Sequence, residues 1–315
     1  MSTRHFVDPE LLPALEALPS FVLSAETLPL IRQSFAEIFG QAPDTGHPNV
    51  ETTATEIRGP EGHPLRLLIH RPRALSAKRP AVLHIHGGGY VLGSPEISTN
   101  ANQMLANEAD CVVVSVDYRL APETAHPGPV EDCYAGLKWL NDNAVSLGVD
   151  PARIAVAGES AGGGLAAGLA ILARDRGEIA LFHQHLIYPM IDDRTCTRAP
   201  NPMTGEFIWT PASNHFGWAS LLGAEPGSDG VSPYAAAARA DDLRGLPSTF
   251  IYVGALDLFV DENIIYAMRL ISACVPTELH VFPGAFHGFE AEQDAAVTKT
   301  AMRLSIDALR RALHR

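Results

Sequence analysis

The sequence predicts an α/β protein with a mostly parallel central sheet that helices flank on both faces. Short apolar runs bounded by turn residues alternate with longer amphipathic stretches, and this order requires crossover connections between parallel strands. Two of the runs, 111–116 and 153–158, are apolar almost throughout, as strands buried on both faces usually are. The 315 residues are enough for one large domain with a sizeable core.

The alternating stretches give the order of the elements. The predicted strands are 81–86, 111–116, 153–158, 181–188, 249–254 and 278–282. The predicted helices are 97–109, 130–147, 161–176, 260–273 and 291–313. An earlier pair, 50–57 and 65–70, flanks the turn sequence GPEGHP and predicts an antiparallel start to the sheet. The last strand, 278–282, would lie at a sheet edge, where pairing with a second copy would give a homodimer.

Two segments stand outside this alternation. Residues 24–40 carry an apolar face with helical spacing that ends at Gly40, and this face needs an apolar partner. Residues 190–225 hold four aromatic side chains among loop-forming residues. We expect the two segments to cover each other as a lid. The alternative is that 190–225 forms a long surface loop with a small core of its own.

These observations predict a single domain over residues 1–315 with two parts. The expected cap consists of about 1–45 and 190–225, and the expected core of about 46–189 and 226–315. The segments are distant in the sequence, so this division requires the chain to leave the core and return to it.

Charge and composition restrict the partners and the location. A formal net charge of −13 makes nucleic acid and anionic membranes unsuitable partners, because both need a basic face. Residues 1–20 lack the uninterrupted apolar stretch of a secretory signal, and the run 111–116 is too short to span a bilayer. The absence of CxxC spacing favours free thiols in a reducing cytosol over disulfides or a zinc site. We therefore expect a cytoplasmic protein without membrane insertion. The cysteines concerned are Cys111, Cys133, Cys196 and Cys274.

The sharpest local pattern is Gly158-Glu159-Ser160-Ala161-Gly162, between an apolar run and a stretch of small residues. It matches the G-x-S-x-G pattern of a serine nucleophile on a sharp strand-to-helix turn. The two glycines prevent clashes with the neighbouring strand and helix, and the helix N-terminus favours negative charge beside the serine. The pattern predicts that Ser160 is a nucleophile. The alternative is a tight turn with an inert serine.

A serine nucleophile needs a histidine base and an acid that orients it, and in this architecture the acid precedes the histidine. Among the later histidines, His183, His185 and His280 lie inside strand-like runs, and His314 lies at the C-terminus. His287 follows the last predicted strand in a glycine-bounded loop. Because catalytic groups concentrate on loops that a rigid scaffold positions, we predict that His287 is the base.

The acid is expected after the strand 249–254. Asp257 lies just past the strand end, at the carboxyl edge of the sheet, where ligand sites of open α/β folds collect. Asp261 and Glu262 come about one helical turn later and are typical of a first helical turn, where they complement the helix dipole. We predict Asp257 as the acid, with Asp261 as the alternative.

The predicted strand 81–86 ends in His86 and three successive glycines, which need a geometric reason because glycine loses much backbone entropy on ordering. Acyl transfer places negative charge on a carbonyl oxygen, and preorganised amide donors stabilise that charge. We predict an oxyanion hole formed by the amides of Gly88, Gly89 and Ala161, with His86 bracing the loop. A phosphate-binding loop is disfavoured, because neither of the common glycine-rich phosphate motifs follows.

Four motifs in family order make the chain resemble the hormone-sensitive-lipase-like bacterial carboxylesterases of the α/β-hydrolase superfamily. They are HGGGYVLGS (86–94), DYRLAPE (117–123), GESAGG (158–163) and FHGF (286–289). The resemblance runs from about residue 45 to the end of the chain. It implies an α/β-hydrolase fold and hydrolysis of small acyl esters without a metal or another cofactor. It also implies a cap built from the N-terminal helices and an insertion.

Two positions depart from the family pattern. Glu159 precedes the serine where the family commonly has aspartate, and Leu258-Phe259 follows the predicted acid where the family usually has Pro-Leu. The second departure bears on the geometry of the loop and of the nearby pocket wall. Within DYRLAPE, we interpret Asp117, Arg119 and Glu123 as structural ties, because the triad leaves them no catalytic role.

The sequence-based hypothesis is a serine carboxylesterase for short- to medium-chain acyl esters that acts through an acyl-enzyme. We expect Tyr90, Phe207, Trp209 and Leu258 to contact the substrate. One alternative is an amidase, deacetylase or acyltransferase with the same catalytic residues, because a fold does not fix a substrate. The other is a non-catalytic receptor for a small molecule on the same scaffold, which would be expected to lack a member of the triad.

Overall fold

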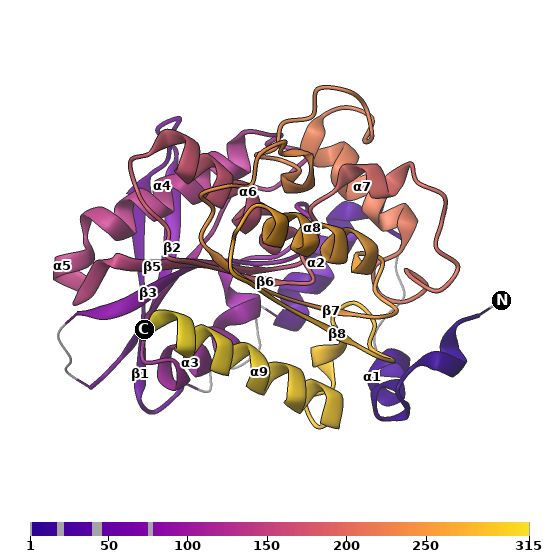
Figure 1. Ribbon diagram of the computed structural model, residues 1–315, viewed down its shortest axis with the longest axis horizontal. Coiled ribbons are helices and arrows are strands. Elements are labelled where there is room, and N and C mark those ends of the chain that lie inside the picture. Colours follow the sequence, from indigo (N-terminus) through magenta and orange to yellow (C-terminus); the bar gives the residue numbers. More distant parts are fainter. Residues whose placement is uncertain (1, 18–21, 40–45, 75–77, 315) are drawn as a thin grey trace.

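The computed structural model describes residues 2–17, 22–39, 46–74 and 78–314. At its centre lies an eight-stranded sheet with the order β1-β2-β4-β3-β5-β6-β7-β8 (Figure 1). β2 runs antiparallel to both of its neighbours, and the other adjacent pairs are parallel. The strands are β1 (Val50–Arg58), β2 (Pro64–Pro72), β3 (Arg79–Ile85), β4 (Val112–Val116), β5 (Val149–Glu159), β6 (His183–Ile187), β7 (Ser248–Gly254) and β8 (Thr277–Phe282).

Helices cover both faces of the sheet. Figure 1 shows α4, α6 and α8 above the sheet and α3 and α9 below it. Their bounds are α3 (Thr99–Glu108), α4 (Gly128–Asp142), α6 (Ala161–Arg176), α8 (Val260–Ser272) and α9 (Ala296–Leu313). The predicted α/β architecture, with a mostly parallel sheet between two helical layers, is therefore confirmed.

Small side chains allow α6 to pack tightly against the rest of the core. Every residue of this helix from Ala161 to Ala173 is buried. A Cβ atom at Gly164 would lie 2.0 Å from the carbonyl oxygen of Met190, and one at Gly168 would lie 2.3 Å from that of Tyr234. These separations leave no room for a side chain, so the glycines permit the close approach.

The register of the parallel strands brings distant segments to one edge of the sheet. Ile85 at the end of β3 pairs with Gly158 near the end of β5. Tyr252 of β7 pairs with Ile187 at the end of β6. The glycine-rich segment, the serine turn and the segment after β7 therefore leave the sheet at the same carboxyl edge, where ligand sites of open α/β folds form.

The predicted strands and helices of the core lie where they were expected, with three differences. The predicted helix 291–313 begins only at Ala296, as α9. β5 begins at Val149, which pairs with Arg79 before a shift in register. The predicted helix 130–147 divides at Asn143 into α4 and α5 (Ala144–Leu147). The Asn143 side chain donates a hydrogen bond of 2.8 Å to the carbonyl of Trp139, which satisfies a helix-terminal acceptor there.

The insertion 190–225 contains a helix that the sequence analysis did not predict, α7 (Pro211–Leu222). Thr210 caps it by accepting a hydrogen bond of 3.3 Å from the amide of Ser213, and Pro211 occupies its first turn. Gly223 ends it in the left-handed conformation. The interpretation of 190–225 as a surface loop is thus only partly correct.

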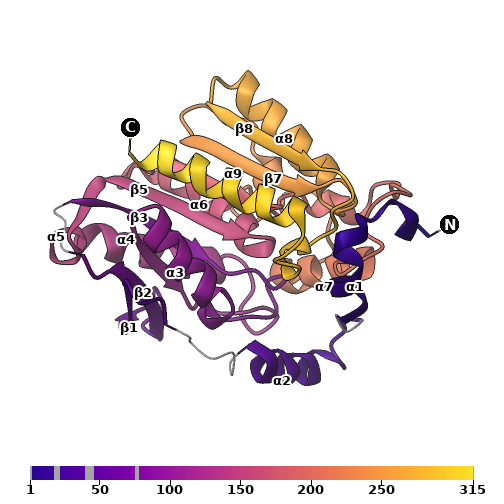
Figure 2. The ribbon, with the colours of Figure 1, turned by 90° about the horizontal axis from the view of Figure 1, so that it is seen from below.

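The N-terminal part of the chain contributes α1 (Leu12–Ala17) and α2 (Leu28–Phe39). The predicted helix end at Gly40 lies outside the described residues. Figure 2 shows α1 and α7 at the end of the molecule toward which β7 and β8 point. The backbone amide and hydroxyl of Thr3 both donate to Glu206, so the N-terminal segment contacts the insertion.

Arg32 ties α2 to the core. Its guanidinium donates hydrogen bonds of 2.8 Å to the carbonyls of Val91 and Ala121, and it forms an ion pair of 2.7 Å with Glu123. Two of these partners are main-chain carbonyls of the core, in the segments that follow HGGG and DYRL. Arg32, with its fixed fork of donors, therefore ties α2 to the core in addition to the packing of the buried Leu28 and Ile31.

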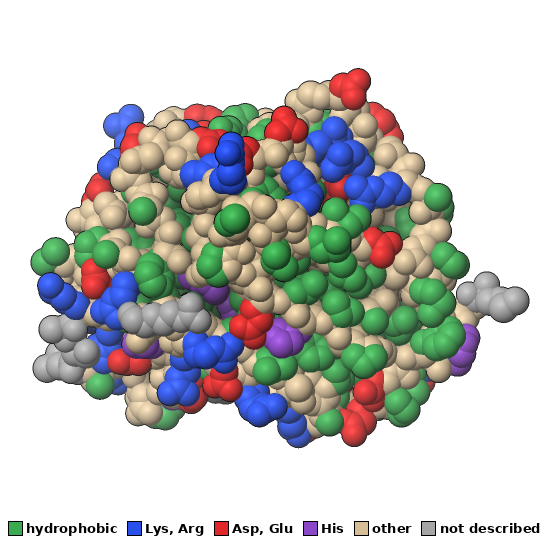
Figure 3. Space-filling view, viewed as in Figure 1, with side chains coloured by type: hydrophobic (Ala, Val, Ile, Leu, Met, Phe, Trp, Pro, Cys, Tyr) green, Lys and Arg blue, Asp and Glu red, His purple; other side chains and the backbone are tan. Residues whose placement is uncertain are grey.

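β8 pairs with β7 and has no second neighbour among the described strands, so 278–282 does lie at a sheet edge. Hydrophobic side chains gather beside it over α8 (Figure 3). The exposed hydrophobic residues of these two elements are Ile265, Met268, Ile271 and Val281. Pairing of two copies across this edge stays a prediction.

We predict that Arg32→Ala lowers the free energy of unfolding by about 1–3 kcal/mol, because it removes charge-assisted hydrogen bonds to partly buried carbonyls. Urea unfolding measures the loss. The control is Gln33→Ala, one position along the same helix, where the side chain makes an exposed hydrogen bond to Glu37. Equal losses in the two variants would contradict the anchoring role of Arg32.

Candidate active site

Ser160 lies in the turn between β5 and α6 with φ of 55° and ψ of −121°. An L-residue rarely adopts this conformation, so the surroundings must hold it. Its amide donates a hydrogen bond of 2.9 Å to the carbonyl of Ile187, and its carbonyl accepts one of 3.0 Å from the amide of Met190. The end of β6 thus fixes the turn from one side.

The two glycines of the G-x-S-x-G pattern fix the turn from the other side. A Cβ atom at Gly158 would lie 2.4 Å from the carbonyl oxygen of Gly162. A Cβ atom at Gly162 would lie 2.0 Å from the carbonyl oxygen of Ile85. Both positions therefore require glycine, as the sequence pattern indicates, and α6 begins directly against the end of β3.

Ser160, His287 and Asp257 are joined by hydrogen bonds. The Oγ atom of Ser160 lies 2.9 Å from Nε2 of His287, and Nδ1 of His287 lies 2.8 Å from Oδ2 of Asp257. All three residues are buried, with exposed fractions of 7, 7 and 1%. The second carboxylate oxygen of Asp257 accepts a hydrogen bond of 2.9 Å from the amide of Phe259. This arrangement holds the imidazole between an acid and a hydroxyl.

The structure brings Asp257, and not the alternative Asp261, to His287. Asp261 is exposed and accepts a hydrogen bond of 3.2 Å from the side chain of Asn201. Of the histidines in strands, His183 contacts Ser248 and His185 contacts Ser305. These two therefore bind hydroxyl groups within the sheet and under α9, away from Ser160.

The glycines after β3 form a turn beside Ser160. Gly88 and Gly89 have φ of 121° and 60°, which favour glycine. A Cβ atom at Gly88 would lie 2.2 Å from the carbonyl oxygen of Leu92. One at Gly89 would lie 2.1 Å from the indole ring of Trp209. The glycines are therefore required by the backbone turn and by an aromatic side chain packed on it.

The amides predicted as an oxyanion hole have no competing partner among the described residues. Within the described part of the chain, no hydrogen bond is donated by the backbone N–H of Gly88, Gly89 or Ala161. A Cβ atom at Gly87 would lie 3.5 Å from Cβ of Ser160, so this loop runs directly beside the serine. These donors are free to bind an oxygen atom near Ser160.

His86 supports the glycine loop from the core. Its ring stacks on that of Tyr118 at 4.3 Å, and the Tyr118 hydroxyl donates a hydrogen bond of 3.0 Å to the His86 carbonyl. Burial lowers the pKa of His86 to about 4, so its imidazole is neutral at physiological pH. An uncharged ring suits a bracing role beside a site where negative charge develops.

The four residues expected to contact substrate occupy different environments. Trp209 covers the glycine loop, with its ring centroid 6.3 Å from that of His287. Phe207 lies against Phe286 at 6.1 Å, and both Phe207 and Leu258 are partly exposed. Tyr90 is fully buried, and its hydroxyl donates to the carbonyl of Met190 at 2.8 Å. Its placement corrects the expectation for Tyr90, which supports the loop from inside the core.

The two departures from the family pattern have clear positions. Glu159 lies beside His84, with both carboxylate oxygens 3.0 Å from Nε2 of the imidazole. Leu258 packs against Gly205 of the insertion, where a Cβ atom on the glycine would lie 2.8 Å from the leucine side chain. The ring of Phe259 stands edge-on to His287 at 5.3 Å. Phe259 therefore forms part of the wall around the histidine, Leu258 packs against the insertion, and Asp257 stays in contact with the imidazole.

The charged residues of DYRLAPE make ion pairs, which agrees with their interpretation as structural ties. Asp117 lies 2.9 Å from Arg66. Arg119 lies 2.8 Å from the buried Asp132 on α4. Glu123 is the partner of Arg32 on α2, so this motif connects the core with the N-terminal helices.

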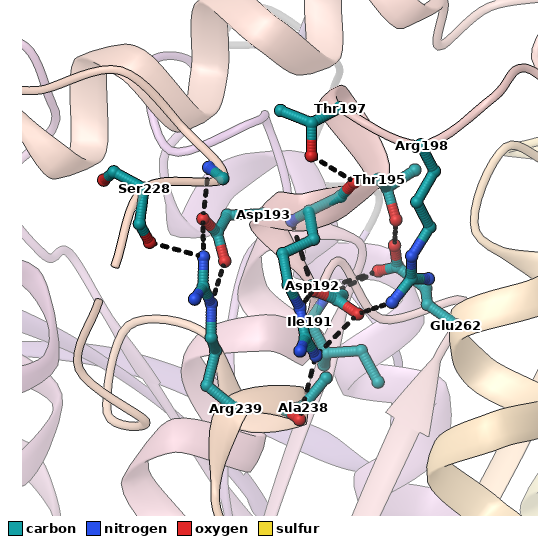
Figure 4. Close-up of polar contacts among 12 residues, drawn as sticks. Ile191, Asp192, Asp193, Thr195, Thr197, Arg198, Ser228, Ala238, Arg239 and Glu262 are labelled. Atoms are coloured by element: carbon teal, nitrogen blue, oxygen red, sulfur yellow. Dashed lines mark hydrogen bonds and ion pairs between the residues drawn. The ribbon is translucent and has the colours of Figure 1, made fainter. Parts of the chain in front are cut away.

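A buried polar network anchors the beginning of the insertion (Figure 4). Glu262 accepts hydrogen bonds of 2.8 and 3.2 Å from the amides of Ile191 and Asp192. Asp192 pairs with Arg194 at 2.7 Å, and Asp193 pairs with Arg239 at 2.7 Å. Burial raises the pKa of Glu262 well above its usual value. The chain is thus held in place directly after the segment that contacts Ser160.

Sequence reasoning missed two members of this region. Glu262 was expected to be a first-turn residue that complements the dipole of α8, yet its side chain is buried and binds the insertion. Asn214 accepts a hydrogen bond of 3.2 Å from the indole of Trp209 and so fixes its orientation. The Glu262 contact has no local sequence signal, because it joins segments about 70 residues apart. The Asn214 contact is local, but it depends on the unpredicted helix α7, on which Asn214 lies.

Neither a metal cluster nor a membrane span was found in the part of the chain that the structure describes. No group of three or more His, Cys, Asp or Glu residues there is arranged to hold a metal ion. None of the described helices is both long and apolar enough to cross a membrane.

Comparisons with known proteins agree with this geometry. A family model described as the alpha/beta hydrolase fold matches residues 82–291. "Esterase LipI" of Mycobacterium tuberculosis is 34% identical over 314 residues, which are 98% of this chain and 96% of that protein. "Carboxylesterase NlhH" of the same species is 33% identical over 316 residues, 99% and 98% of the two chains. The solved structure of "Bacterial Heroin Esterase" superposes with a TM-score of 0.93 at 38% identity and 99% coverage of both chains.

The chain belongs to the hormone-sensitive-lipase-like bacterial carboxylesterases of the α/β-hydrolase superfamily. It is accordingly a carboxylic ester hydrolase.

We predict that Gly89→Ala lowers kcat/KM about 10- to 100-fold, because the new methyl group displaces either the glycine loop or the indole of Trp209. Steady-state hydrolysis of a p-nitrophenyl ester measures the loss. The control is Gly177→Ala, since Gly177 has a similar φ of 67° but no atom within 4 Å of its Cβ position. Gly177→Ala measures the cost of placing alanine in this backbone conformation alone, about 1 kcal/mol of stability, without the clash between the new methyl group and Trp209.

If both alanine variants retain the wild-type kcat/KM, the close packing of Trp209 on the glycine loop is not needed for activity.

Proposed function

We propose that this enzyme hydrolyses short- to medium-chain acyl esters through a triad of Ser160, His287 and Asp257. The observation that carries the proposal is the pair of hydrogen bonds of 2.9 and 2.8 Å that connects serine, imidazole and carboxylate. A hydroxyl is a weak nucleophile at neutral pH, and an oriented imidazole activates it. The non-catalytic receptor hypothesis loses its main support, because no member of this triad is missing.

The proposed reaction has two steps. In the first, Ser160 Oγ attacks the ester carbonyl while His287 Nε2 takes its proton, and the same nitrogen then protonates the leaving alcohol. In the second, His287 takes a proton from water, the resulting hydroxide attacks the acyl-enzyme, and Ser160 recovers its proton. Asp257 orients the imidazole and stabilises its positive charge in both steps.

The negative charge of each tetrahedral intermediate is assigned to the amides of Gly88, Gly89 and Ala161. Each such donor stabilises the transition state by about 2.7–4 kcal/mol when it is preorganised. Support comes from the turn conformation of both glycines and from the lack of competing hydrogen bonds to these amides. Ala161 is also the first residue of α6, where the helix dipole favours negative charge.

We further propose that the N-terminal segment and the insertion 190–225 act together as a cap that limits the length of the acyl chain. Two observations support this division. Thr3 donates a hydrogen bond to Glu206. Phe207 of the insertion and Leu11 and Leu12 of the N-terminal segment belong to the same apolar cluster. Trp209 and Phe207 would close the site beside His287, which favours compact acyl groups over long ones.

We predict that Ser160→Ala lowers turnover of p-nitrophenyl esters about 10⁶-fold, because the nucleophile is lost. Activity of the wild type across acetate, butyrate, octanoate and palmitate esters gives the depth of the acyl pocket, and we expect a maximum at short or medium chains. Ser146→Ala, a change of an exposed serine on α5, is the control and should retain wild-type activity. Substantial hydrolysis by Ser160→Ala, or a maximum at palmitate, would contradict the proposal.

Asp257→Asn and Asp261→Asn remove the same charge at neighbouring positions and separate the two candidate acids. We predict that Asp257→Asn lowers kcat about 10,000-fold, because an amide does not hold the imidazole in the required tautomer. Asp261→Asn should leave kcat within about twofold of wild type, since exposed charges contribute little. Similar losses in both variants would show that Asp257 has no special role.

A further inference from the structure

A second carboxyl group is buried near the catalytic histidine. Glu290 lies in the short 3-10 helix Phe289–Ala291, which begins two residues after His287. Its Oε1 atom accepts a hydrogen bond from the hydroxyl of Tyr252, and its Oε2 atom is inaccessible to solvent. Carboxylates are seldom buried without a cation to neutralise them, and within the described residues Glu290 has no ion pair with lysine or arginine.

Tyr188 links this carboxyl group to the imidazole. Its ring stands edge-on to that of His287 at 4.6 Å and lies 5.9 Å from the ring of Tyr252. Tyr188 has φ of 33°, a rare conformation that its amide holds by donating a hydrogen bond of 2.7 Å to the carbonyl of Tyr252. Such strain is typical of functional sites, and here it places a phenol ring directly against the catalytic base.

The electrostatics of the group agree with this geometry. Burial raises the pKa of Glu290 to about 7, against the effect of the Tyr252 and Tyr188 hydroxyls and of His287, which favour the charged form. Electrostatic coupling is mutual. A carboxylate that a positive imidazole stabilises is placed to stabilise positive charge that forms on that imidazole during the reaction.

We propose that Glu290 is a positioning residue for His287: its carboxylate, held by the hydroxyl group of Tyr252, stabilises the imidazolium that forms when Ser160 gives up its proton. The proposal rests on the triad assigned above. Glu290 does not touch the serine or the substrate in this scheme. It acts through the tyrosine layer behind the histidine, while Asp257 holds Nδ1.

The charged and titratable groups around this layer come from several elements. Glu159 and Asp257 act on the Tyr188 hydroxyl with the same sign as Glu290 and raise its pKa. From α9, the exposed Lys299 pairs with the exposed Asp294. From the N-terminal segment, Glu10 accepts a hydrogen bond from the amide of Ala296. His287 is thus the nearby cation that Glu290 can stabilise among the contacts of the described residues.

The test compares Glu290→Gln with wild type in kcat, KM and thermal unfolding from pH 5 to 9. Gln keeps an acceptor for Tyr252 and removes the charge. We expect kcat above pH 7 to fall about 3- to 10-fold with KM unchanged, and the acid limb of the kcat/KM profile to move about half a unit lower in pH, because a neighbouring negative charge is lost.

Stability should change in the opposite direction. A buried carboxyl with a pKa raised from its unfolded value of 4.5 to about 7 costs stability as the pH rises through that range. At pH 8 we therefore expect Glu290→Gln to unfold at the same temperature as wild type or higher, and at pH 5 this advantage should be absent. A variant that is as stable but slower separates a role in the reaction from a structural one.

Glu292→Gln is the matched control, since it removes the same charge two positions along the chain. Its kcat and pH profile should equal those of wild type. Three outcomes would overturn the proposal. Glu290→Gln could keep both the kcat and the acid limb of the kcat/KM profile of wild type, or Glu292→Gln could shift that acid limb equally. Glu290→Gln could also lose kcat together with stability at both pH values while the acid limb stays unmoved.

Labelling of Ser160 by a fluorophosphonate separates these failures from a failure of the triad. If wild-type Ser160 does not react, the proposed function fails and the role of Glu290 fails with it. If Ser160 reacts and any of the outcomes above is found, only the role of Glu290 is overturned.

Discussion

The rare backbone conformation of Ser160 is the constraint on which the site depends. With φ of 55°, the residue must be held from both sides. Glycines at 158 and 162 allow the carbonyl oxygens of Gly162 in α6 and Ile85 in β3 to lie close against the turn. The carbonyl of Ile187 and the amide of Met190 complete the restraint. The turn that presents the hydroxyl therefore also fixes the end of β6 and the point where the insertion begins.

Everything else in the site follows from parallel strands that end together. Because β3, β5, β6, β7 and β8 share one carboxyl edge, the segments after them deliver an amide-rich loop, a nucleophile, a tyrosine, an acid and a base to one place. The strands are buried and rigid, whereas the catalytic groups stand on short loops. The insertion is fixed after Met190 by Glu262, Asp192 and Asp193, so Trp209 returns to the glycine loop from a firmly anchored start.

The sequence was sufficient for features that local chemistry determines. Alternating apolar runs predicted all eight strands of the sheet. The G-x-S-x-G pattern predicted the serine turn, because a clash with an atom only a few residues away requires its first glycine. It was insufficient where distant segments meet. Gly89 was interpreted through the oxyanion alone, yet Trp209 also requires it. Tyr90 appeared to be a substrate contact, but its hydroxyl binds Met190 inside the core. Helix α7 was missed because aromatic residues among loop formers obscured its Thr-Pro start.

Asp257 and Glu290 are two carboxyl groups near His287, and their different surroundings suit them to different roles. Asp257 accepts N–H hydrogen bonds from the imidazole and from the amide of Phe259, and these two contacts fix its orientation. Glu290 is bound by the hydroxyl of Tyr252 within an aromatic layer, and burial raises its pKa to about 7. The first arrangement suits a group that orients the base. The second suits a group whose charge appears near neutrality, in the range where the base must be free to accept a proton.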